Sequence, residues 1–460
     1  MKLISTLVAP LLGSLAWVAA ASAQKPNFIV IVADDLGYGD LGCYGSTRNR
    51  TPNIDQLAAE GARFTDFHSN GPMCTPTRAA LMTGRYQHRF GKEFESALAG
   101  QAGAGVGLPL QAVTLAERLK ESGYATGMFG KWHLGYEPPF LPTRQGFDEF
   151  RGLLCGDGDH HTHRDRAGGR DWWHNEMPAV ESGYTAELLT KHSVSFIERN
   201  RDRPFFLYLP HLAIHFPWQG PDDPPHRVEE KDYKGDKFGF ISDRANVAPH
   251  VKAMVEALDA SVGVVMAALR RLKLEENTLV IFTSDNGGYI NYGDSHQNIS
   301  NNGPLRGQKG ELFEGGHRVA GIVRWPGRIE PRVETAFAMT FDFFPTILQL
   351  AGIGAVETDA VDLGSLLFQR KALPERNAFW RMHGRWAVRQ GSWKLIENGN
   401  GPMLFNLGKD LGEAHDAAAA NPEQVIRMRQ LYEAWDKEVA RGVPGVPMLH
   451  DAKQQKEKKD

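Results

Sequence analysis

The stretch Phe28-Ile29-Val30-Ile31-Val32-Ala33, followed at once by Asp34-Asp35, decides how the fold is interpreted. An unbroken, β-branched apolar run of this length is typical of a strand that is buried on both faces, as inside a parallel sheet. The two adjacent carboxylates at its end repel each other and need either a cation or contact with solvent. The stretch therefore predicts a buried central strand that ends in a cation site or in a solvated turn.

The same arrangement recurs further along the chain. Three more buried strands are predicted at residues 124–129, 204–209 and 279–283. The polar clusters that follow them contain Lys131, His133, His215, Asp285 and Asn286. Strands that alternate with helices indicate an α/β fold, with a large, mostly parallel central sheet flanked by helices. Sites in such sheets lie beyond the carboxyl ends of the strands, so we expect these clusters to converge.

Composition divides the chain into three predicted segments. Residues 1–23 combine a positive end, a short apolar run and a small-x-small site, which predicts a signal peptide. The run is too short and interrupted to favour a membrane anchor. The α/β domain is predicted over residues 24–375, and a smaller α+β subdomain with a short antiparallel sheet and a helix over 376–460. The mature protein is therefore expected to be exported, to the periplasm or the medium, with no membrane span.

Charge and cysteine content limit the possible partners. The formal net charge is −3 and no basic stripe is present, so nucleic acid is not an expected partner. Three cysteines, Cys43, Cys74 and Cys155, are too few for a disulfide scaffold. Cys43 and Cys155 could pair or remain free, and the sequence does not distinguish the two.

Cys74 opens a polar turn that leads into a predicted helix. Thr75 is a candidate N-cap and Pro76 suits the first helical position. Cys74 would then lie just outside a helix N-terminus, where the helix dipole favours an anion, and Arg78 would add a full positive charge. Taken alone, a lone cysteine is more simply interpreted as a buried thiol before an ordinary helix.

The residue order around Cys74 changes that interpretation. Cys-x-Pro-x-Arg, followed by Leu-Met-Thr-Gly-Arg, resembles the signature of the type I sulfatases of the alkaline phosphatase superfamily. In that family the cysteine is oxidised after translation to formylglycine. Thr77 replaces the commoner serine, and the Cys, Pro and Arg of the motif are present. Gly130-Lys-Trp-His-Leu-Gly135 and Gly303-Pro-Leu-Arg-Gly-x-Lys-Gly310 extend the resemblance, which is to the arylsulfatase and N-acetylgalactosamine-6-sulfatase type.

This resemblance implies a calcium-dependent sulfuric ester hydrolase with a defined set of site residues. It makes Asp34, Asp35, Asp285 and Asn286 calcium ligands, with residue 74 completing the shell, and all-oxygen donors suit Ca²⁺. It makes the hydrated aldehyde of Cys74 the nucleophile, held by Arg78, while Lys131 and Lys309 neutralise the sulfate. It assigns proton transfers to His133 and His215, both expected to titrate near neutral pH. It also implies a formylglycine-generating enzyme as a partner. His211 stays a rival of His215 as the acid.

A polar, aperiodic stretch over residues 138–178 predicts how the substrate is bound. Its histidines invite a metal interpretation, but their spacing fits no closed zinc site, and we favour a substrate rim. The predicted rim contains His160, His161, His163, Arg164 and Trp218, with Trp172 and Trp173 as further stacking faces. Such side chains suit a sugar and predict a sulfated saccharide, from a glycosaminoglycan or an algal polymer.

Two other functions are open at this point. One is a phosphate or phosphonate ester hydrolase of the same superfamily, whose members tend to use a Thr or Ser nucleophile and two metals, unlike Cys74 here. The other is a secreted binding protein without catalysis, which the presence of every expected catalytic residue disfavours.

Overall fold

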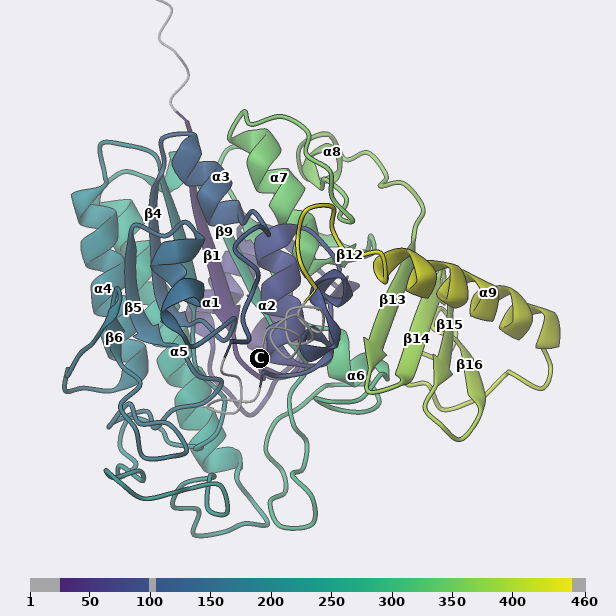
Figure 1. Cartoon of the computed structure of the whole chain (residues 1–460), viewed down its shortest axis with the longest axis horizontal. Coiled ribbons are helices and arrows are strands. Elements are labelled where there is room, and N and C mark those ends of the chain that lie inside the picture. Colours follow the sequence, from purple (N-terminus) through teal and green to yellow (C-terminus); the bar gives the residue numbers. More distant parts are fainter. Residues whose placement is uncertain (1–24, 99–104, 449–460) are drawn as a thin grey trace, which may run out of the picture.

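A large mixed sheet forms the centre of the protein (Figure 1). The computed structural model describes residues 25–98 and 105–448, so the predicted signal peptide, residues 1–23, lies outside the described residues. Ten strands follow the order β11-β2-β10-β9-β1-β8-β4-β5-β6-β7. In that order the strands span Arg332–Glu334, Ala62–Phe64, Gly321–Arg324, Thr278–Ser284, Asn27–Ala33, Phe205–Pro210, Ala125–Lys131, Glu149–Leu153, Trp173–His174 and Met177–Pro178.

The five strands at the middle of this sheet, β9, β1, β8, β4 and β5, run parallel to their neighbours. Antiparallel pairs occur toward the edges, where β10 joins β9 and β6 joins β5. The strand predicted over residues 28–33 is β1, and all of its side chains are buried. The predicted α/β fold with a large, mostly parallel sheet is confirmed.

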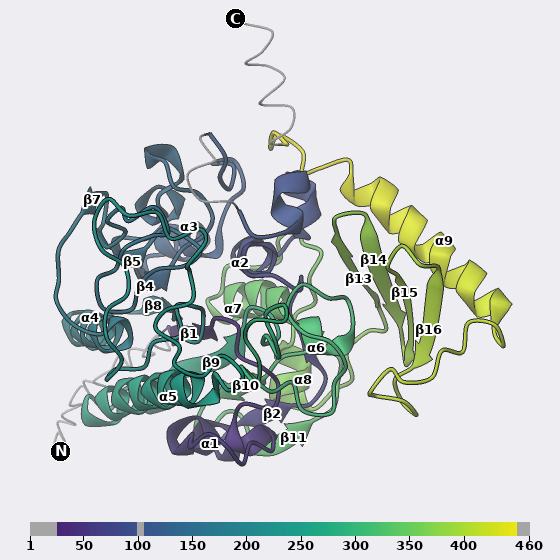
Figure 2. The same ribbon diagram turned by 90° about the horizontal axis from the view of Figure 1, so that it is seen from below.

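Helices cover both faces of the sheet (Figure 2). On one face α1 (Pro52–Ala59), α4 (Thr185–Arg199) and α5 (Ala248–Arg271) pack against Ile29 and Ile31 of β1. On the other face α2 (Cys74–Thr83), α3 (Leu115–Glu121), α7 (Phe343–Leu350) and α8 (Gly364–Gln369) pack against Phe28 and Val30. Because alternate residues of β1 serve the two cores, its sequence from Phe28 to Ala33 has no polar positions.

Local sequence signals explain where several elements begin. Thr114 caps α3 through a capping box with Glu117. Short elements complete the fold: β3 (Phe67–His68) pairs with β12 (Ala338–Met339), and α6 spans Glu314–His317. The 3₁₀ turns span Gly42–Tyr44, Gln87–Phe90, Lys92–Glu95, Pro138–Phe140, Pro142–Gln145, Glu275–Asn277 and Thr340–Asp342.

A separate antiparallel sheet follows the large one in the chain (Figure 1). Its strands lie in sequence order: β13 (Asn377–Met382), β14 (Arg385–Gln390), β15 (Trp393–Glu397) and β16 (Pro402–Asn406). Helix α9 (Pro422–Val439) packs on this sheet, where Tyr432 stacks on Trp386 with 4.0 Å between ring centroids. The small sheet and helix were expected from the sequence, and a domain boundary at residue 375 stays a prediction.

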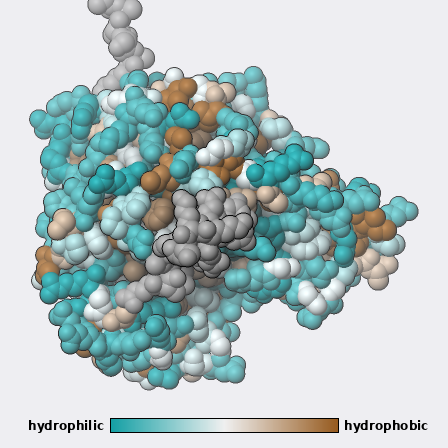
Figure 3. All heavy atoms as spheres, viewed as in Figure 1, coloured by the Kyte–Doolittle hydropathy of each residue, from teal (hydrophilic) through white to brown (hydrophobic). Residues whose placement is uncertain are grey.

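Hydrophilic residues cover most of the face shown in Figure 3. None of the helices within residues 25–98 and 105–448 is long and apolar enough to cross a membrane.

Candidate functional site

The polar residues at the carboxyl ends of the parallel strands lie together. Asp34 follows β1, Lys131 is the last residue of β4, and Asp285 follows β9. Lys131 Nζ lies 2.5 Å from Asp34 Oδ2, and Arg78 Nη2 lies 2.7 Å from Asp285 Oδ2. Arg78 also donates from Nη1 to the carbonyl oxygen of Lys131 at 2.8 Å. A buried arginine therefore links the ends of two strands to helix α2.

Cys74 is the first residue of α2 and points into this cluster. Met73 holds the N-cap position, so the prediction that Thr75 caps the helix is wrong. The Thr75 hydroxyl instead donates to the carbonyl oxygen of His133 and accepts from the backbone N–H of Leu98, both at 3.1 Å. Cys74 is 1% exposed, and its Sγ lies within 4.8 Å of carboxylate oxygens of Asp34 and Asp285. The nucleophile position thus faces both the carboxylates and the helix N-terminus.

Three oxygen atoms in this cluster have no hydrogen-bond partner among the described residues: Asp34 Oδ1, Asp35 Oδ2 and Asn286 Oδ1. The Asn286 amide is oriented by its Nδ2, which donates to Asp35 Oδ1 at 2.8 Å, and this leaves its oxygen free. Unsatisfied buried oxygens are costly unless a cation or a donor meets them. Carboxylate and amide oxygens are the donors that a hard divalent cation prefers, so these residues fit a metal such as Ca²⁺.

The carboxylates differ in how their surroundings affect their pKa. Burial, reinforced by the charge of Asp285, raises the pKa of Asp34 well above its usual value. Burial also acts to raise the pKa of Asp285, but Arg78 and then Lys131 outweigh it, so that this pKa is lowered. Asp35 adopts a left-handed backbone conformation with φ 63°, which costs a non-glycine residue energy and is often found at functional sites.

The pKa values of two histidines of this site, His133 and His215, are lowered by their surroundings. Burial and the charge of Lys131 lower the pKa of His133, and burial and the charge of Lys309 lower that of His215, well below the usual value. The sequence expectation of titration near neutral pH therefore does not describe the free site. His215 donates from Nδ1 to the carbonyl oxygen of Phe216 at 2.8 Å, which leaves its Nε2 3.8 Å from Asp35 Oδ2.

The rival histidine, His211, occupies a different environment. It is fully buried, and its Nε2 lies 3.1 Å from the Ser261 hydroxyl on α5. Burial lowers its pKa to about 3. His211 does not line the cavity described next, whereas His215 does, so the geometry favours His215 as the acid.

A cavity of about 520 Å³ opens at this cluster. Cys74, His133, His215 and Lys309 line its inner part, together with Met73, the residue before Cys74. Lys309 Nζ lies 2.5 Å from Asp35 Oδ1. The remaining lining residues, which come from loops, are Ala97, Leu98, Cys155, Gly156, Asp157, Asp165, Arg166, Ala167, Phe216, Lys234, Lys237, Tyr289 and Tyr292.

The predicted substrate rim does not line this cavity. His160 is 1% exposed, and its Nε2 lies 3.2 Å from the carbonyl oxygen of His215. His163 stacks on Trp172 with ring centroids 4.5 Å apart, and Trp218 stacks on Phe238 at 5.2 Å. These rings pack against other side chains of the protein, so His160, His163 and Trp218 are structural residues that do not line the cavity.

The other two predicted rim residues also lie elsewhere. His161 is half-buried, with its Nε2 3.3 Å from the carbonyl oxygen of Gly220. Arg164 lines a separate cavity of about 100 Å³ and pairs with Glu229 at 3.0 Å. The whole stretch is ordered around the buried carboxylate of Asp159, which accepts backbone N–H groups from both His161 and Arg227. Its histidines therefore help to form the loop and do not line the cavity at Cys74, and a role for them in substrate binding stays a prediction.

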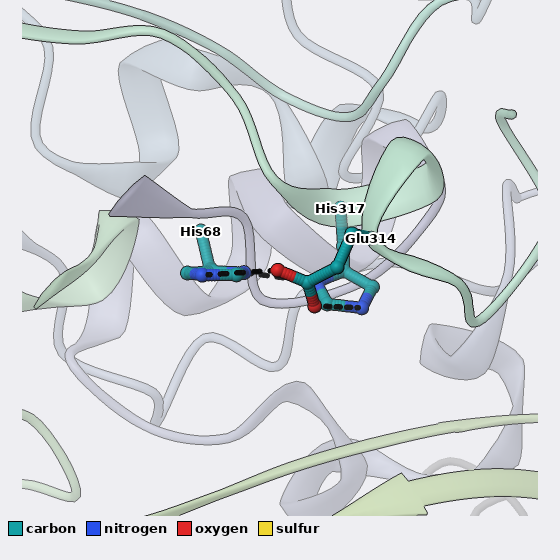
Figure 4. A group of neighbouring side chains, drawn as sticks. All are labelled: His68, Glu314 and His317. Carbon is teal, nitrogen blue, oxygen red and sulfur yellow. Dashed lines mark hydrogen bonds and ion pairs between the residues drawn. The ribbon is translucent and has the colours of Figure 1, made fainter. Parts of the chain in front are cut away.

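A second histidine and carboxylate cluster, drawn in Figure 4, does not line this cavity. His68 and His317 each lie 3.9 Å from Glu314, and the three could in principle hold a metal. However, Lys394 of β15 places its Nζ 2.8 Å from Glu314 Oε1 and 3.0 Å from His317 Nε2. A buried ammonium at that distance repels a second cation, so this cluster serves as a charged link to the small sheet.

The three cysteines, all among the described residues, are free thiols, and Cys43 does not pair with Cys155.

Comparison with known proteins identifies the family. The sulfatase family model matches residues 26–353. The chain belongs to the sulfatase family. It is a sulfuric ester hydrolase with the α/β fold of the alkaline phosphatase superfamily, as the sequence motifs predicted.

Several known sulfatases align with this sulfatase over most of its length. Human arylsulfatase A is 36% identical over 477 residues, which cover 89% of this chain and 88% of the relative. N-acetylgalactosamine-6-sulfatase from Canis lupus familiaris is 32% identical over 490 residues, which cover 94% and 89%. The crystal structure of Ps i-CgsB in complex with k-i-k-neocarrahexaose superposes with a TM-score of 0.78 at 32% identity, covering 90% of this chain and 93% of that one.

Sequence reasoning missed the loop residues that form the outer cavity of this sulfatase. Arg166, Lys237, Tyr289 and Tyr292 all line it. They come from aperiodic loops, in which a charged or aromatic residue carries no signal of its direction. One clue was available, because Tyr289 and Tyr292 follow shortly after the Asp285-Asn286 pair at a strand end.

Proposed function

We propose that this sulfatase is an exported, calcium-dependent enzyme that hydrolyses sulfate esters of carbohydrates through a formylglycine made from Cys74. One observation carries the proposal: Cys74, which lines the cavity together with Lys309 and His215, has its Sγ within 4.8 Å of a carboxylate oxygen of Asp34, in a buried cluster where three oxygens have no hydrogen-bond partner among the described residues. The formylglycine requires a maturing enzyme as a partner, and export requires the predicted signal peptide.

Asp34, Asp35, Asp285 and Asn286 would hold the cation. Bound Ca²⁺ would supply positive charge toward the oxygens of the sulfate ester. A hydrated formylglycine at position 74 would supply a hydroxyl nucleophile in place of the thiol. Arg78, which is 1% exposed and paired with Asp285, holds helix α2, and with it residue 74, beside the proposed metal ligands.

In this mechanism, Lys131 and Lys309 bind the sulfate and neutralise its charge. Lys131 and Lys309 have fully desolvated side chains, so their charges act on a bound sulfate with little screening. Preorganised charges of this kind stabilise the additional negative charge that develops on the oxygens of the ester. Both lysines are held in place by carboxylates, and neither must reorganise when the substrate enters.

The two histidines move protons at defined atoms. His133 donates from Nε2 to the carbonyl oxygen of Leu98 at 3.0 Å, so its Nδ1 carries the lone pair that can accept a proton. His215 would donate from Nε2 to the oxygen of the departing alcohol. The negative charge of a bound sulfate ester opposes the effect of Lys309 on His215 and favours the protonated form that this step needs.

Carbohydrate is the substrate class that the relatives and the cavity support. One relative is named for N-acetylgalactosamine 6-sulfate, and another was crystallised with k-i-k-neocarrahexaose. The outer cavity of this chain combines the rings of Phe216, Tyr289 and Tyr292 with charged side chains. Aromatic faces beside polar groups suit the apolar faces and hydroxyl groups of a sugar.

Sulfate release from a panel of substrates tests this proposal. The enzyme, co-expressed with a formylglycine-generating enzyme, is expected to release sulfate from sulfated mono- and oligosaccharides, and Cys74→Ala is expected to release none. Removal of calcium with a chelator should abolish turnover, and added Ca²⁺ should restore it. Hydrolysis of phosphate or phosphonate esters without release of sulfate, or turnover that survives chelation, would contradict the proposal.

A further inference from the structure

Two cations lie in the outer cavity directly beside the proposed acid. Arg166 Cζ and Lys237 Nζ lie 5.1 and 5.3 Å from the centroid of the same ring, that of Phe216. Phe216 follows His215 in the chain, and both residues line the cavity. Positive charge is therefore concentrated on the side of the cavity where the leaving alcohol, and hence the sugar, would lie.

Arg166 and Lys237 each have N–H groups that donate to no acceptor among the described residues. Lys237 Nζ donates to the Tyr292 hydroxyl at 2.6 Å, and no carboxylate of the described residues lies within ion-pair distance of it. Arg166 uses Nε for Asp157 Oδ2 at 2.8 Å, and among the described residues nothing accepts from its two Nη atoms. Asp157 is also paired with the buried Arg227 at 2.7 Å, so one carboxylate is shared by two guanidinium groups. Asp165 and Lys234 line the cavity as well, so the cations Arg166, Lys234 and Lys237 outnumber the carboxylates Asp157 and Asp165, and the excess charge of the outer cavity is positive.

A wall of aromatic rings joins these cations to the inner site. Lys309 Nζ lies 5.2 Å from the ring centroid of Tyr289, whose ring is 5.1 Å from that of Tyr292. Lys237 Nζ lies 4.5 Å from the centroid of Tyr292. A sugar whose sulfate meets Lys309 can therefore extend along the two tyrosines toward Lys237.

We propose that Arg166 and Lys237 form a second anion-binding subsite, which binds a sulfate or carboxylate group on the cleaved sugar or on the next sugar. The two free Nη atoms of Arg166 match the paired oxygens of such a group, and Lys237 adds a point charge. The subsite rests on the proposed function and defines its substrate more narrowly, as a saccharide with at least two anionic groups.

The test compares substrates that differ in their second charge. Suitable substrates are a hexosamine with one sulfate ester, the same hexosamine with two, and a disaccharide of the monosulfated hexosamine and a uronic acid. kcat/KM is measured for each with the mature enzyme and with Lys237→Met. Lys231→Met is the matched control, because Lys231 lies in the same loop over a single ring, that of Tyr233, and does not line the cavity.

The enzyme is expected to prefer a substrate with two anions, and Lys237→Met should reduce this preference about tenfold or more, the effect of losing one charge-assisted hydrogen bond. The substrate that shows the effect identifies the second anion as sulfate or carboxylate. Lys231→Met should leave the preference unchanged. An equal preference in all three proteins would overturn the subsite while leaving the proposed function intact.

Binding measurements decide the subsite independently of turnover. Calorimetry with the disulfated hexosamine and the unreactive Cys74→Ala protein should show weaker binding after Lys237→Met is added, and no change after Lys231→Met is added. If the mature enzyme released no sulfate from any substrate, the proposed function would fail. Unchanged binding in the Lys237→Met background would overturn the subsite.

Discussion

Replacement of Lys394 by methionine tests how the small sheet is attached to the rest of the protein. The side chain of Lys394 is fully buried, and its Nζ lies 2.8 Å from Glu314 Oε1 and 3.0 Å from Glu413 Oε1. Methionine fills a similar volume but leaves two buried carboxylates without their shared cation. Removal of one partner from a buried charge pair typically costs about 3–5 kcal/mol, which is a large part of the stability of a folded protein.

Urea denaturation, followed by tryptophan fluorescence, measures this loss. Lys120→Met is the control, because Lys120 pairs with Asp148 at 2.8 Å but both side chains are roughly half exposed. Exposed pairs contribute about 1 kcal/mol or less, so the control should unfold close to the wild type. In urea titrations above pH 7, where Glu413 becomes ionised, adding Glu413→Gln to Lys394→Met should recover part of the loss, since one uncompensated charge disappears. A loss for Lys394→Met no larger than that of the control would refute the reasoning.

Three further predictions concern charge and proton transfer. Replacement of Asn286 by leucine removes one proposed calcium ligand and should weaken Ca²⁺ binding roughly tenfold or more in a calorimetric titration of the purified enzyme. His215→Gln should lower kcat on saccharide sulfates about 10²–10⁴-fold, and should lower it less on sulfate esters of acidic phenols, whose leaving groups need no protonation. The control His211→Gln should mainly lower stability. Equal losses of kcat on both ester types would argue against His215 as the acid. Burial, then the charge of Glu314, raises the pKa of Glu413 from 4.5 to about 7. The stabilisation that protonated Glu413 gives is therefore complete below pH 4.5 and is lost as the pH rises to about 7. In urea titrations at several pH values, Glu413→Gln should reduce this fall in the free energy of unfolding with pH.

The central part of the fold could be predicted because its causes are local. The run from Phe28 to Ala33 has no polar residue, and the structure buries it between two cores. Parallel strands place their carboxyl ends at one edge, which is why Asp34, Lys131 and Asp285 lie together although they are far apart in the chain. The position of Cys74 at a helix start also follows from neighbouring residues.

The outer part of the site could not be predicted, because its geometry depends on distant contacts. The histidines at 160–163 looked like a binding surface, but the Asp159 carboxylate draws backbone groups around it and turns the loop inward. The cationic residues that do line the cavity, Arg166 and Lys237, occur in stretches with no periodicity. Their position is determined by the Phe216 ring, which the sequence does not place.

The N-cap of α2 shows how a tertiary contact overrides a local preference. Thr75 has a favoured N-cap side chain, yet its hydroxyl bonds to the backbone of His133 and Leu98. Helix α2 therefore starts two residues earlier than a cap at Thr75 allows, and Cys74 becomes part of its first turn.

The mass of the peptide that contains Cys74, taken from enzyme of known specific activity, tests the central claim most directly. Conversion to formylglycine removes one sulfur and two hydrogen atoms from that residue and adds one oxygen. The account predicts that sulfate-releasing activity rises in proportion to the converted fraction across preparations made with and without a maturing enzyme. Full activity in a preparation whose Cys74 peptide keeps its sulfur would contradict it.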